Sequence, residues 1–134
     1  MIRLPKMDFP VEKLLNLARA AREMAYAPYS GFPVGAALLT TRGQVYKGCN
    51  VENASYGLTV CAERVALFKA VSEGERDFAA LAVVAGTEKQ CVPCGACLQV
   101  LAEFNPQLTV FMGNSRGEYR EKRVADLLPV IFTL

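Results

Sequence analysis

Apolar residues recur along residues 12–25 at the spacing of one helical face. The members of this stripe stand mostly three or four positions apart: Leu14, Leu17, Ala18, Ala21, Met24 and Ala25. Polar residues occupy the opposite face, so the pattern predicts an amphipathic helix that ends before Pro28. Residues 1–10 contain two prolines and no period, which predicts an irregular segment ahead of this helix.

Several segments further along the chain predict strands, and two of them, residues 34–39 and 78–85, are apolar runs that suit buried strands. Residues 34–39 form the first run, and residues 45–49 return from a turn that contains Gly43. Residues 78–85 and 108–112 predict two more strands, and the segment around Tyr119 predicts a fifth, weaker one.

Three further helices alternate with these strands. Residues 61–73 are apolar on nearly every side, which predicts a helix in the interior, ended by Gly74. A second helix is marked by apolar residues at helical spacing, namely Cys97, Val100, Leu101 and Phe104. Residues 124–128 predict a short last helix. The order of elements predicts an α/β fold, a three-layer α/β/α sandwich with a mixed, roughly five-stranded sheet, which a hairpin opens and two strand–helix–strand crossovers complete.

Size and composition agree with a single globular domain over residues 1–134, since 52% of the residues are apolar and 21% are charged. The net charge of +2 is too small to argue for a nucleic acid or a membrane surface as partner. The first residues lack the apolar core of a signal peptide, and no run reaches the roughly 18 apolar residues of a membrane span. We therefore expect a cytoplasmic protein with reduced thiols.

The sequence contains no histidine. This excludes Ser-His-Asp and Cys-His catalytic machinery and every zinc site that depends on histidine ligands. A metal ion would have to be bound by Cys, Asp or Glu, and proton transfer would fall to a carboxylate, Lys, Tyr or thiol.

The candidate chemistry lies in two short segments, Cys61-Ala62-Glu63-Arg64 and Pro93-Cys94-Gly95-Ala96-Cys97. Each stands at the start of a predicted helix, where the backbone N–H groups favour a thiolate. Cys94 and Cys97 have a spacing that allows them to share one ion, with Cys61 arriving from the adjacent helix. Three thiolates around zinc leave a fourth position open, which is the mark of a catalytic zinc site.

Two charged residues in the first segment complete this hypothesis. Glu63 is the natural proton carrier, because a long side chain at a helix start can still reach the metal's water. Three thiolates and Zn²⁺ sum to −1, so Arg64 could donate hydrogen bonds to the sulfurs and offset that charge.

Other uses of the cysteines stay open on spacing alone. Cys91, Cys94 and Cys97 form a C-x-x-C-x-x-C run that could hold an iron–sulfur cluster, with Cys61 as the remote fourth ligand. The same four residues could also close a structural Cys₄ zinc site. Cys49 follows a strand and is more typical of a small core residue.

Taken together, the motifs resemble those of a known family, the small, homotetrameric, Cys₃-zinc type of cytidine deaminase in the cytidine/deoxycytidylate deaminase superfamily. The zinc nucleobase deaminases share the pattern H-x-E…P-C-x-x-C, with cysteine as a variant of the histidine. The resemblance spans about residues 12–132 and rests on four ordered segments: residues 29–38, residues 48–56, residues 59–64 and the Pro-Cys-Gly-Ala-Cys segment.

The resemblance implies an activity and a cofactor. One zinc ion per subunit, held by Cys61, Cys94 and Cys97, would activate water, and Glu63 would pass protons to the pyrimidine and to its leaving amino group. Cytidine and deoxycytidine would become uridine and deoxyuridine with release of ammonia, in pyrimidine salvage. A deaminase of the same fold that acts on another aminopyrimidine nucleoside is the alternative.

The resemblance also assigns substrate contacts. Asn50 and Glu52 match residues that bind the ribose 3′-hydroxyl, and Phe32 matches an aromatic that packs against the base. Ala54, Tyr56 and Phe132 match residues that a neighbouring subunit of the homotetramer contributes to a shared site.

This chain departs from the family pattern at two places. Leu98 stands where the family commonly has arginine, from which we expect altered packing or interface chemistry rather than lost catalysis. Cys91 and Val92 replace more usual small polar residues, which brings a fourth thiol close to the metal ligands; we expect it to stay unligated.

Overall fold

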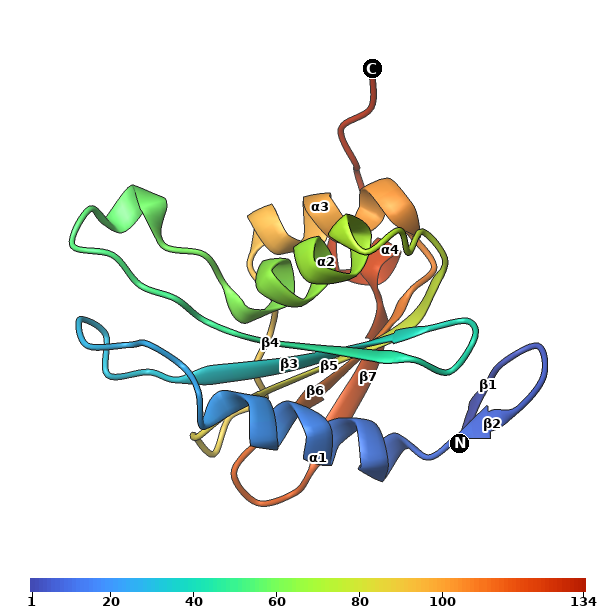
Figure 1. The fold of residues 1–134 in the computed structure, drawn as a ribbon, viewed down its shortest axis with the longest axis horizontal. Helices are drawn as coiled ribbons and strands as arrows, with labels where there is room; N and C mark the ends of the chain where they lie inside the picture. Colours follow the sequence, from blue (N-terminus) through green and yellow to red (C-terminus); the bar gives the residue numbers. More distant parts are fainter.

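A five-stranded mixed sheet in the order β4-β3-β5-β6-β7 forms the centre of the computed structural model, which describes residues 1–134 (Figure 1). Its strands are β3 (Val34–Thr40), β4 (Val45–Cys49), β5 (Phe78–Ala85), β6 (Thr109–Gly113) and β7 (Tyr119–Arg123). β5 and β6 are parallel, and the other neighbours are antiparallel. This confirms the predicted mixed sheet and its opening hairpin.

Helices cover both faces of the sheet, as the sequence predicts (Figure 1). α1 (Val11–Arg22) lies on one face, and α2 (Ala62–Ser72), α3 (Gly95–Phe104) and α4 (Val124–Leu127) lie on the other. α2 connects β4 to β5, and α3 connects β5 to β6. Because β4, β5 and β6 run in the same direction, α2 and α3 both begin at the same edge of the sheet.

Each face of the sheet has its own hydrophobic cluster. Successive side chains of β5 point to opposite faces and so belong to the two clusters in turn. Leu81 and Val83 point toward α2 and α3, whereas Ala80, Ala82 and Val84 point toward α1. A strand buried on both faces needs an apolar residue at every position, which explains the continuous run.

Close packing fixes α2 on the sheet. A Cβ atom at Gly48 of β4 would lie 2.5 Å from both the Ala62 carbonyl oxygen and the Ala66 amide nitrogen. Only glycine allows the first turn of α2 to approach the strand this closely. The position of that turn matters because it carries Cys61, Glu63 and Arg64.

The structure corrects three expectations. Residues 1–10 are not irregular: β1 (Ile2–Arg3) pairs with β2 (Asp8–Phe9), and burial of Ile2 and Phe9 against α1 stabilises this short hairpin. α1 ends at Arg22 rather than near Pro28, so Met24 is 79% exposed. α2 is not wholly interior either, because its outer side faces solvent and leaves Phe68 49% exposed.

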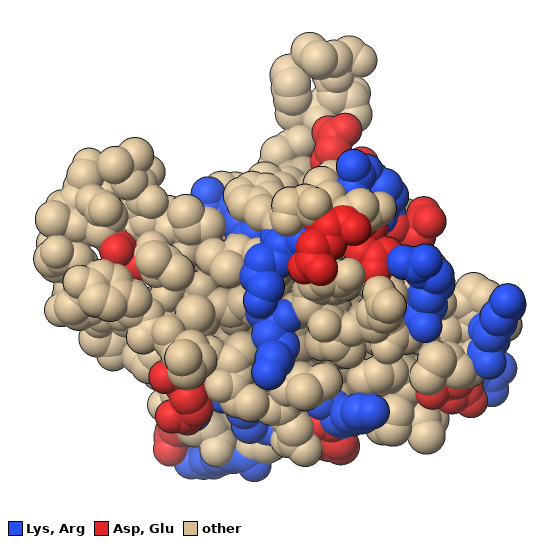
Figure 2. Space-filling view, viewed as in Figure 1, with Lys and Arg blue, Asp and Glu red and all other residues tan.

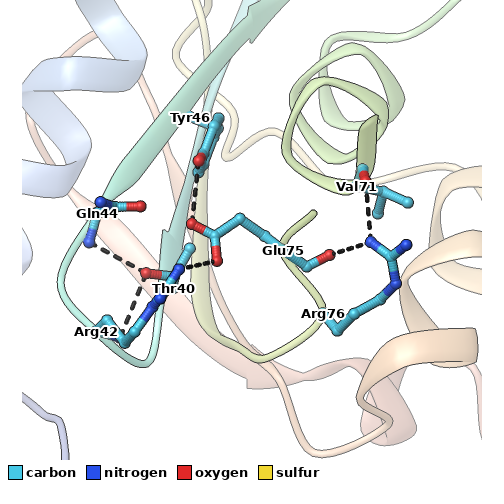
Figure 3. A network of polar contacts seen from close by, with 7 residues as sticks. All are labelled: Thr40, Arg42, Gln44, Tyr46, Val71, Glu75 and Arg76. Atoms are coloured by element: carbon cyan, nitrogen blue, oxygen red, sulfur yellow. Dashed lines mark hydrogen bonds and ion pairs between the residues drawn. The ribbon is translucent and has the colours of Figure 1, made fainter. Parts of the chain in front are cut away.

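At the β3–β4 turn, a polar network surrounds the buried carboxylate of Glu75 (Figure 3). Its two oxygens accept hydrogen bonds from Arg42 Nη2 at 2.5 Å and from the Tyr46 hydroxyl at 3.0 Å. The Thr40 hydroxyl accepts from the backbone N–H groups of Arg42 and Gln44, which closes the turn. This network lies at the amino end of β4, at the opposite edge of the sheet from the starts of α2 and α3.

Charge is spread unevenly over the surface. On the face drawn in Figure 2, acidic and basic side chains alternate over the body of the molecule, and the protruding segment between β4 and α2 carries few of them. That segment includes the 3₁₀ turn η1 (Tyr56–Leu58). None of the helices has both the length and the apolar character that crossing a membrane requires.

Candidate active site

Three cysteines meet where α2 and α3 begin. Cys61 and Cys94 are the N-cap residues of the two helices, each with extended backbone, and Cys97 lies in the first turn of α3. The Sγ atoms of Cys61 and Cys94 are 3.9 Å apart, and those of Cys94 and Cys97 are 3.5 Å apart. All three sulfurs lie within 4.8 Å of one another, which is the separation that ligands of one ion require.

The thiols differ in their tendency to ionise. The pKa of Cys61 is lowered to about 5, chiefly because Cys97 donates a hydrogen bond to its sulfur and also because Arg64 lies beside it. The same hydrogen bond, together with burial, raises the pKa of Cys97. One thiolate therefore forms readily, and binding of a divalent cation would displace the protons of the other two.

The surroundings of the thiols fit zinc. Soft thiolate ligands select zinc among the common divalent ions, and three of them leave one position open. Arg64 Nη2 lies 3.4 Å from Cys61 Sγ, and the buried Nε of the same side chain has no hydrogen-bond partner. A centre with three thiolates and Zn²⁺ carries a net charge of −1, and the neighbouring guanidinium offsets it.

Cys91 does not belong to this group of sulfurs. Burial is the main reason that the pKa of its thiol is raised to about 12, so it stays protonated at neutral pH. The four-cysteine arrangement that an iron–sulfur cluster or a closed zinc site would need is therefore not formed.

Two of the three clustered thiols, those of Cys61 and Cys94, open onto a cavity of about 420 Å³. Its walls include Cys61, Cys94, Glu63, Phe32, Asn50 and Glu52. Glu63 is only 5% exposed, and burial is the main cause that raises its pKa to about 7. The structure thus brings the buried carboxyl group to the thiols, although Cys61 and Glu63 are two positions apart, because Cys61 precedes the helix with extended backbone.

Asn50 and Glu52 hold the loop before β3. Asn50 Oδ1 accepts a hydrogen bond from the Val34 N–H, and Asn50 Nδ2 donates to the Phe32 carbonyl, both at 2.9 Å. Glu52 Oε1 accepts from the N–H groups of Tyr29 and Ser30 at 3.0 Å. These hydrogen bonds, above all those from Ser30, lower the pKa of Glu52.

Ser30 is the residue of this site that sequence reasoning missed. Its hydroxyl donates to Glu52 Oε2 and accepts from the Phe32 N–H at 3.0 Å. A serine hydroxyl that accepts a hydrogen bond from the N–H two positions later is typical of an ST-turn, and this was the available signal. The hydrogen bond from Ser30 to Glu52 could not be predicted from local spacing, because the two residues are 22 positions apart.

Three expected contact residues do not line the cavity. Ala54 and Tyr56 stand on the exposed segment between β4 and α2, where Tyr56 is 75% exposed and packs edge-on against Tyr29 with ring centroids 6.0 Å apart. Phe132 is 70% exposed near the chain end, and its backbone N–H and C=O bond to the side chain of Gln99.

Known proteins share both the sequence pattern and the fold. A family model described as "Cytidine and deoxycytidylate deaminase zinc-binding region" matches residues 10–113. The cytidine deaminase of Sporosarcina psychrophila is 57% identical over 124 residues, which are 92% of this chain and 91% of that protein. The cytidine deaminase of Halalkalibacterium halodurans is 58% identical over 123 residues, 91% of this chain and 93% of that protein.

A solved structure agrees with these sequence matches. The crystal structure of cytidine deaminase from Burkholderia pseudomallei superposes with a TM-score of 0.90 at 54% identity and covers 92% of this chain and 100% of its own. The three-layer fold, the three converging thiols and these matches lead to one conclusion: the chain belongs to the cytidine and deoxycytidylate deaminase family.

Proposed function

We propose that this protein is a zinc-dependent cytidine deaminase, which hydrolyses cytidine and deoxycytidine to uridine and deoxyuridine and releases ammonia. One observation carries the proposal: the buried carboxyl group of Glu63 and two of the three clustered thiols line the same cavity. This arrangement combines a metal site that keeps an open position with a group that can carry protons beside it.

The cofactor in this proposal is one zinc ion per subunit, held by Cys61, Cys94 and Cys97. When bound, zinc supplies a Lewis acid that lowers the pKa of water to about 7. Arg64 stabilises the ionised form of Cys61 through the hydrogen bond to its sulfur.

Glu63 carries the protons of the reaction. It accepts a proton from the attacking water as the oxygen bonds to C4 of the pyrimidine. It delivers that proton to N3, then takes the second proton from the hydroxyl now on C4 and passes it to the amino group. The C4–N bond breaks, ammonia leaves and the C4 carbonyl forms. Burial of Glu63 keeps bulk water away from this transfer, and one carboxylate serves all these positions in a chain that has no histidine.

The remaining cavity residues orient the nucleoside. Phe32 provides an aromatic surface for the base, and Asn50 and Glu52 bind the 3′-hydroxyl of the sugar. These assignments are supported by the position of all three residues in the wall of the cavity.

The proposal includes a homotetramer in which subunits share their sites. Exposure of Tyr56 and Phe132 supports this, because large aromatic side chains that face solvent in one chain are typical of interface residues. Ala54, Tyr56 and Phe132 would enter the cavity of a neighbouring subunit. Sedimentation should give a mass of about four protomers, and a monomer mass would contradict this part.

Three wider parts of the proposal follow from the chemistry. The chain acts as one domain over residues 1–134. Free nucleosides are its substrates, which places it in pyrimidine salvage. A cytoplasmic location is consistent with thiols that have to stay reduced in order to bind the metal.

The test of the function is loss of ultraviolet absorbance when the purified protein is mixed with cytidine. We expect turnover by the wild type, none by Glu63→Gln, and about one zinc per chain in both. A zinc-loaded wild type that does not turn over cytidine would mean that the cavity takes another aminopyrimidine nucleoside. An inactive protein that contains iron would contradict the deaminase assignment itself.

A further inference from the structure

The Ser30 hydroxyl is hydrogen-bonded to two residues, Glu52 and Phe32. In the proposed function these two residues contact different parts of the substrate. The hydroxyl donates its proton to Glu52 Oε2, and it accepts the N–H of Phe32 at 3.0 Å. Glu52 belongs to the sugar side of the cavity and Phe32 to the base side. Ser30 itself also lines the cavity.

Counting hydrogen bonds shows what Ser30 leaves for a ligand. An ionised carboxylate has about four acceptor positions. Two on Oε1 are taken by the N–H groups of Tyr29 and Ser30, and one on Oε2 is taken by the Ser30 hydroxyl. Glu52 therefore keeps one acceptor position, on Oε2, and the Ser30 hydroxyl determines in which direction that position points.

The backbone of Phe32 is held from both sides by the same set of residues. Its N–H donates to the Ser30 hydroxyl, and its C=O accepts from Asn50 Nδ2 at 2.9 Å. Phe32 is 42% exposed, so apolar packing alone does not fix its position. Its place relative to Glu52 depends on these two hydrogen bonds.

We propose that Ser30 is a positioning residue that aims the last free acceptor of Glu52 at one sugar hydroxyl and sets its distance from Phe32. The inference rests on the proposed function, because it takes Glu52 as the acceptor of the 3′-hydroxyl. The Ser30 hydroxyl bonds to Glu52 and Phe32 and to none of the clustered thiols. Its contribution lies in recognition of the sugar, and without its hydroxyl Glu52 can rotate about its side-chain torsions.

The test compares cytidine with 3′-deoxycytidine, which lacks the hydroxyl in question. For the wild type we expect kcat/KM to be roughly 10- to 100-fold higher with cytidine, the size typical of a hydrogen bond to a charged group. Ser30→Ala should shrink this ratio by at least about threefold. Ser30→Thr should restore it, because threonine keeps the hydroxyl. A role in folding alone would lower the activity on both substrates equally and leave the ratio unchanged.

Further variants separate the possible failures. Ser30→Ala combined with Glu52→Gln should have the same ratio as Glu52→Gln alone, because the two residues act as one unit. Ser115→Ala, an exposed serine in the β6–β7 turn, is the matched control and should keep the wild-type ratio. If Ser30→Ala is poorly folded, Ser30→Cys replaces it in the test, because cysteine is close to serine in size. Ser30→Cys should also shrink the ratio.

Two outcomes would overturn the inference, and they are distinguishable. If Glu52→Gln shrinks the ratio and Ser30→Ala does not, Glu52 binds the sugar hydroxyl without help from Ser30. If Glu52→Gln leaves the ratio at the wild-type value, the sugar contact in the proposed function is wrong, and the inference about Ser30 fails with it.

Discussion

The guanidinium of Arg64 lies against the thiol of Cys61, one turn earlier along α2, with 3.4 Å between Nη2 and Sγ. The contact is intrahelical, since Cys61 is the N-cap residue of the helix that carries Arg64. It places a permanent positive charge beside a group of three thiols whose ionised forms repel one another.

Arg64→Gln should therefore weaken the site. We expect zinc affinity or kcat/KM to fall about 10- to 100-fold, the range typical of residues that support metal ligands. The zinc content that remains after dialysis reports the metal affinity, and the rate of cytidine turnover reports kcat/KM. Arg116→Gln removes an exposed arginine, 63% of whose side chain is accessible, and should change neither. Equal zinc retention and activity in both variants would show that Arg64 does not support the metal site.

Replacing single cysteines should separate ligands from neighbours. Cys97→Ser should lose zinc and activity together, because two thiolates cannot hold the ion as three do. Cys91→Ala should keep zinc content and turnover near the wild-type values, since Cys91 is not part of the group of clustered sulfurs. Metal analysis and the absorbance assay give both answers. Zinc loss in Cys91→Ala would instead point to a fourth ligand.

Removal of bound metal should abolish turnover without unfolding the chain. The two hydrophobic clusters, of 16 and 11 buried residues, hold the layers together independently of the thiols. A chelator should therefore stop cytidine conversion while the far-ultraviolet circular dichroism spectrum is kept, and added zinc should restore activity. Loss of the spectrum on chelation would show that the metal is required for folding.

Glu75 should contribute to stability far from the site (Figure 3). Its carboxylate is buried and accepts from Arg42 and Tyr46, so Glu75→Ala leaves both donors without their partner. We expect the free energy of unfolding to fall by about 1–3 kcal/mol. Glu88→Ala breaks an exposed ion pair with Arg116 and should change it by less than about 0.5 kcal/mol. Denaturant titration of the two variants measures the contrast, and equal effects would contradict it.

The same network should give stability a dependence on alkaline pH. Burial, followed by the hydrogen bond to Glu75, raises the pKa of Tyr46 above its usual value of 10.0. The folded protein therefore keeps this proton at a pH where the unfolded chain has lost it. The resulting stability is complete below about pH 10 and is lost as the pH rises through the folded pKa. Tyr46→Phe should show a smaller decline than the wild type in unfolding measured between pH 9 and 11. If the stability of both proteins falls equally over this pH range, groups other than Tyr46 cause the decline.

Gly48→Ala should displace α2. The added Cβ would lie 2.5 Å from backbone atoms of Ala62 and Ala66, so the helix start has to move. Overpacking of this kind costs about 1–3 kcal/mol of stability. Gly57→Ala is the matched control, because nothing lies within 4 Å of its added Cβ. Thermal unfolding of the two variants tests the difference, and similar melting temperatures would show that α2 accommodates the methyl group.

Sequence patterns predicted most of the elements because their cause is local. The bounds of β4 and β5 agree with the predicted residues 45–49 and 78–85, since turn residues punctuate each segment and β5 is an almost fully buried apolar run. The helix starts at Cys61 and Cys94 were also predicted. The β1–β2 hairpin was missed, because its stability comes from packing of Ile2 and Phe9 against α1, which is a tertiary effect.

The sequence by itself determined which chemistry was available: no histidine, four cysteines whose spacing suits metal ligands, and a glutamate two residues after the first of them. Only the tertiary structure decided which cysteines meet, because the separation of 33 residues between Cys61 and Cys94 is closed by two crossovers that begin their helices at one edge of the sheet. It also decided that Cys91 stays outside the group and that Ser30 joins Glu52. Such contacts depend on how distant segments pack, and no local spacing encodes them.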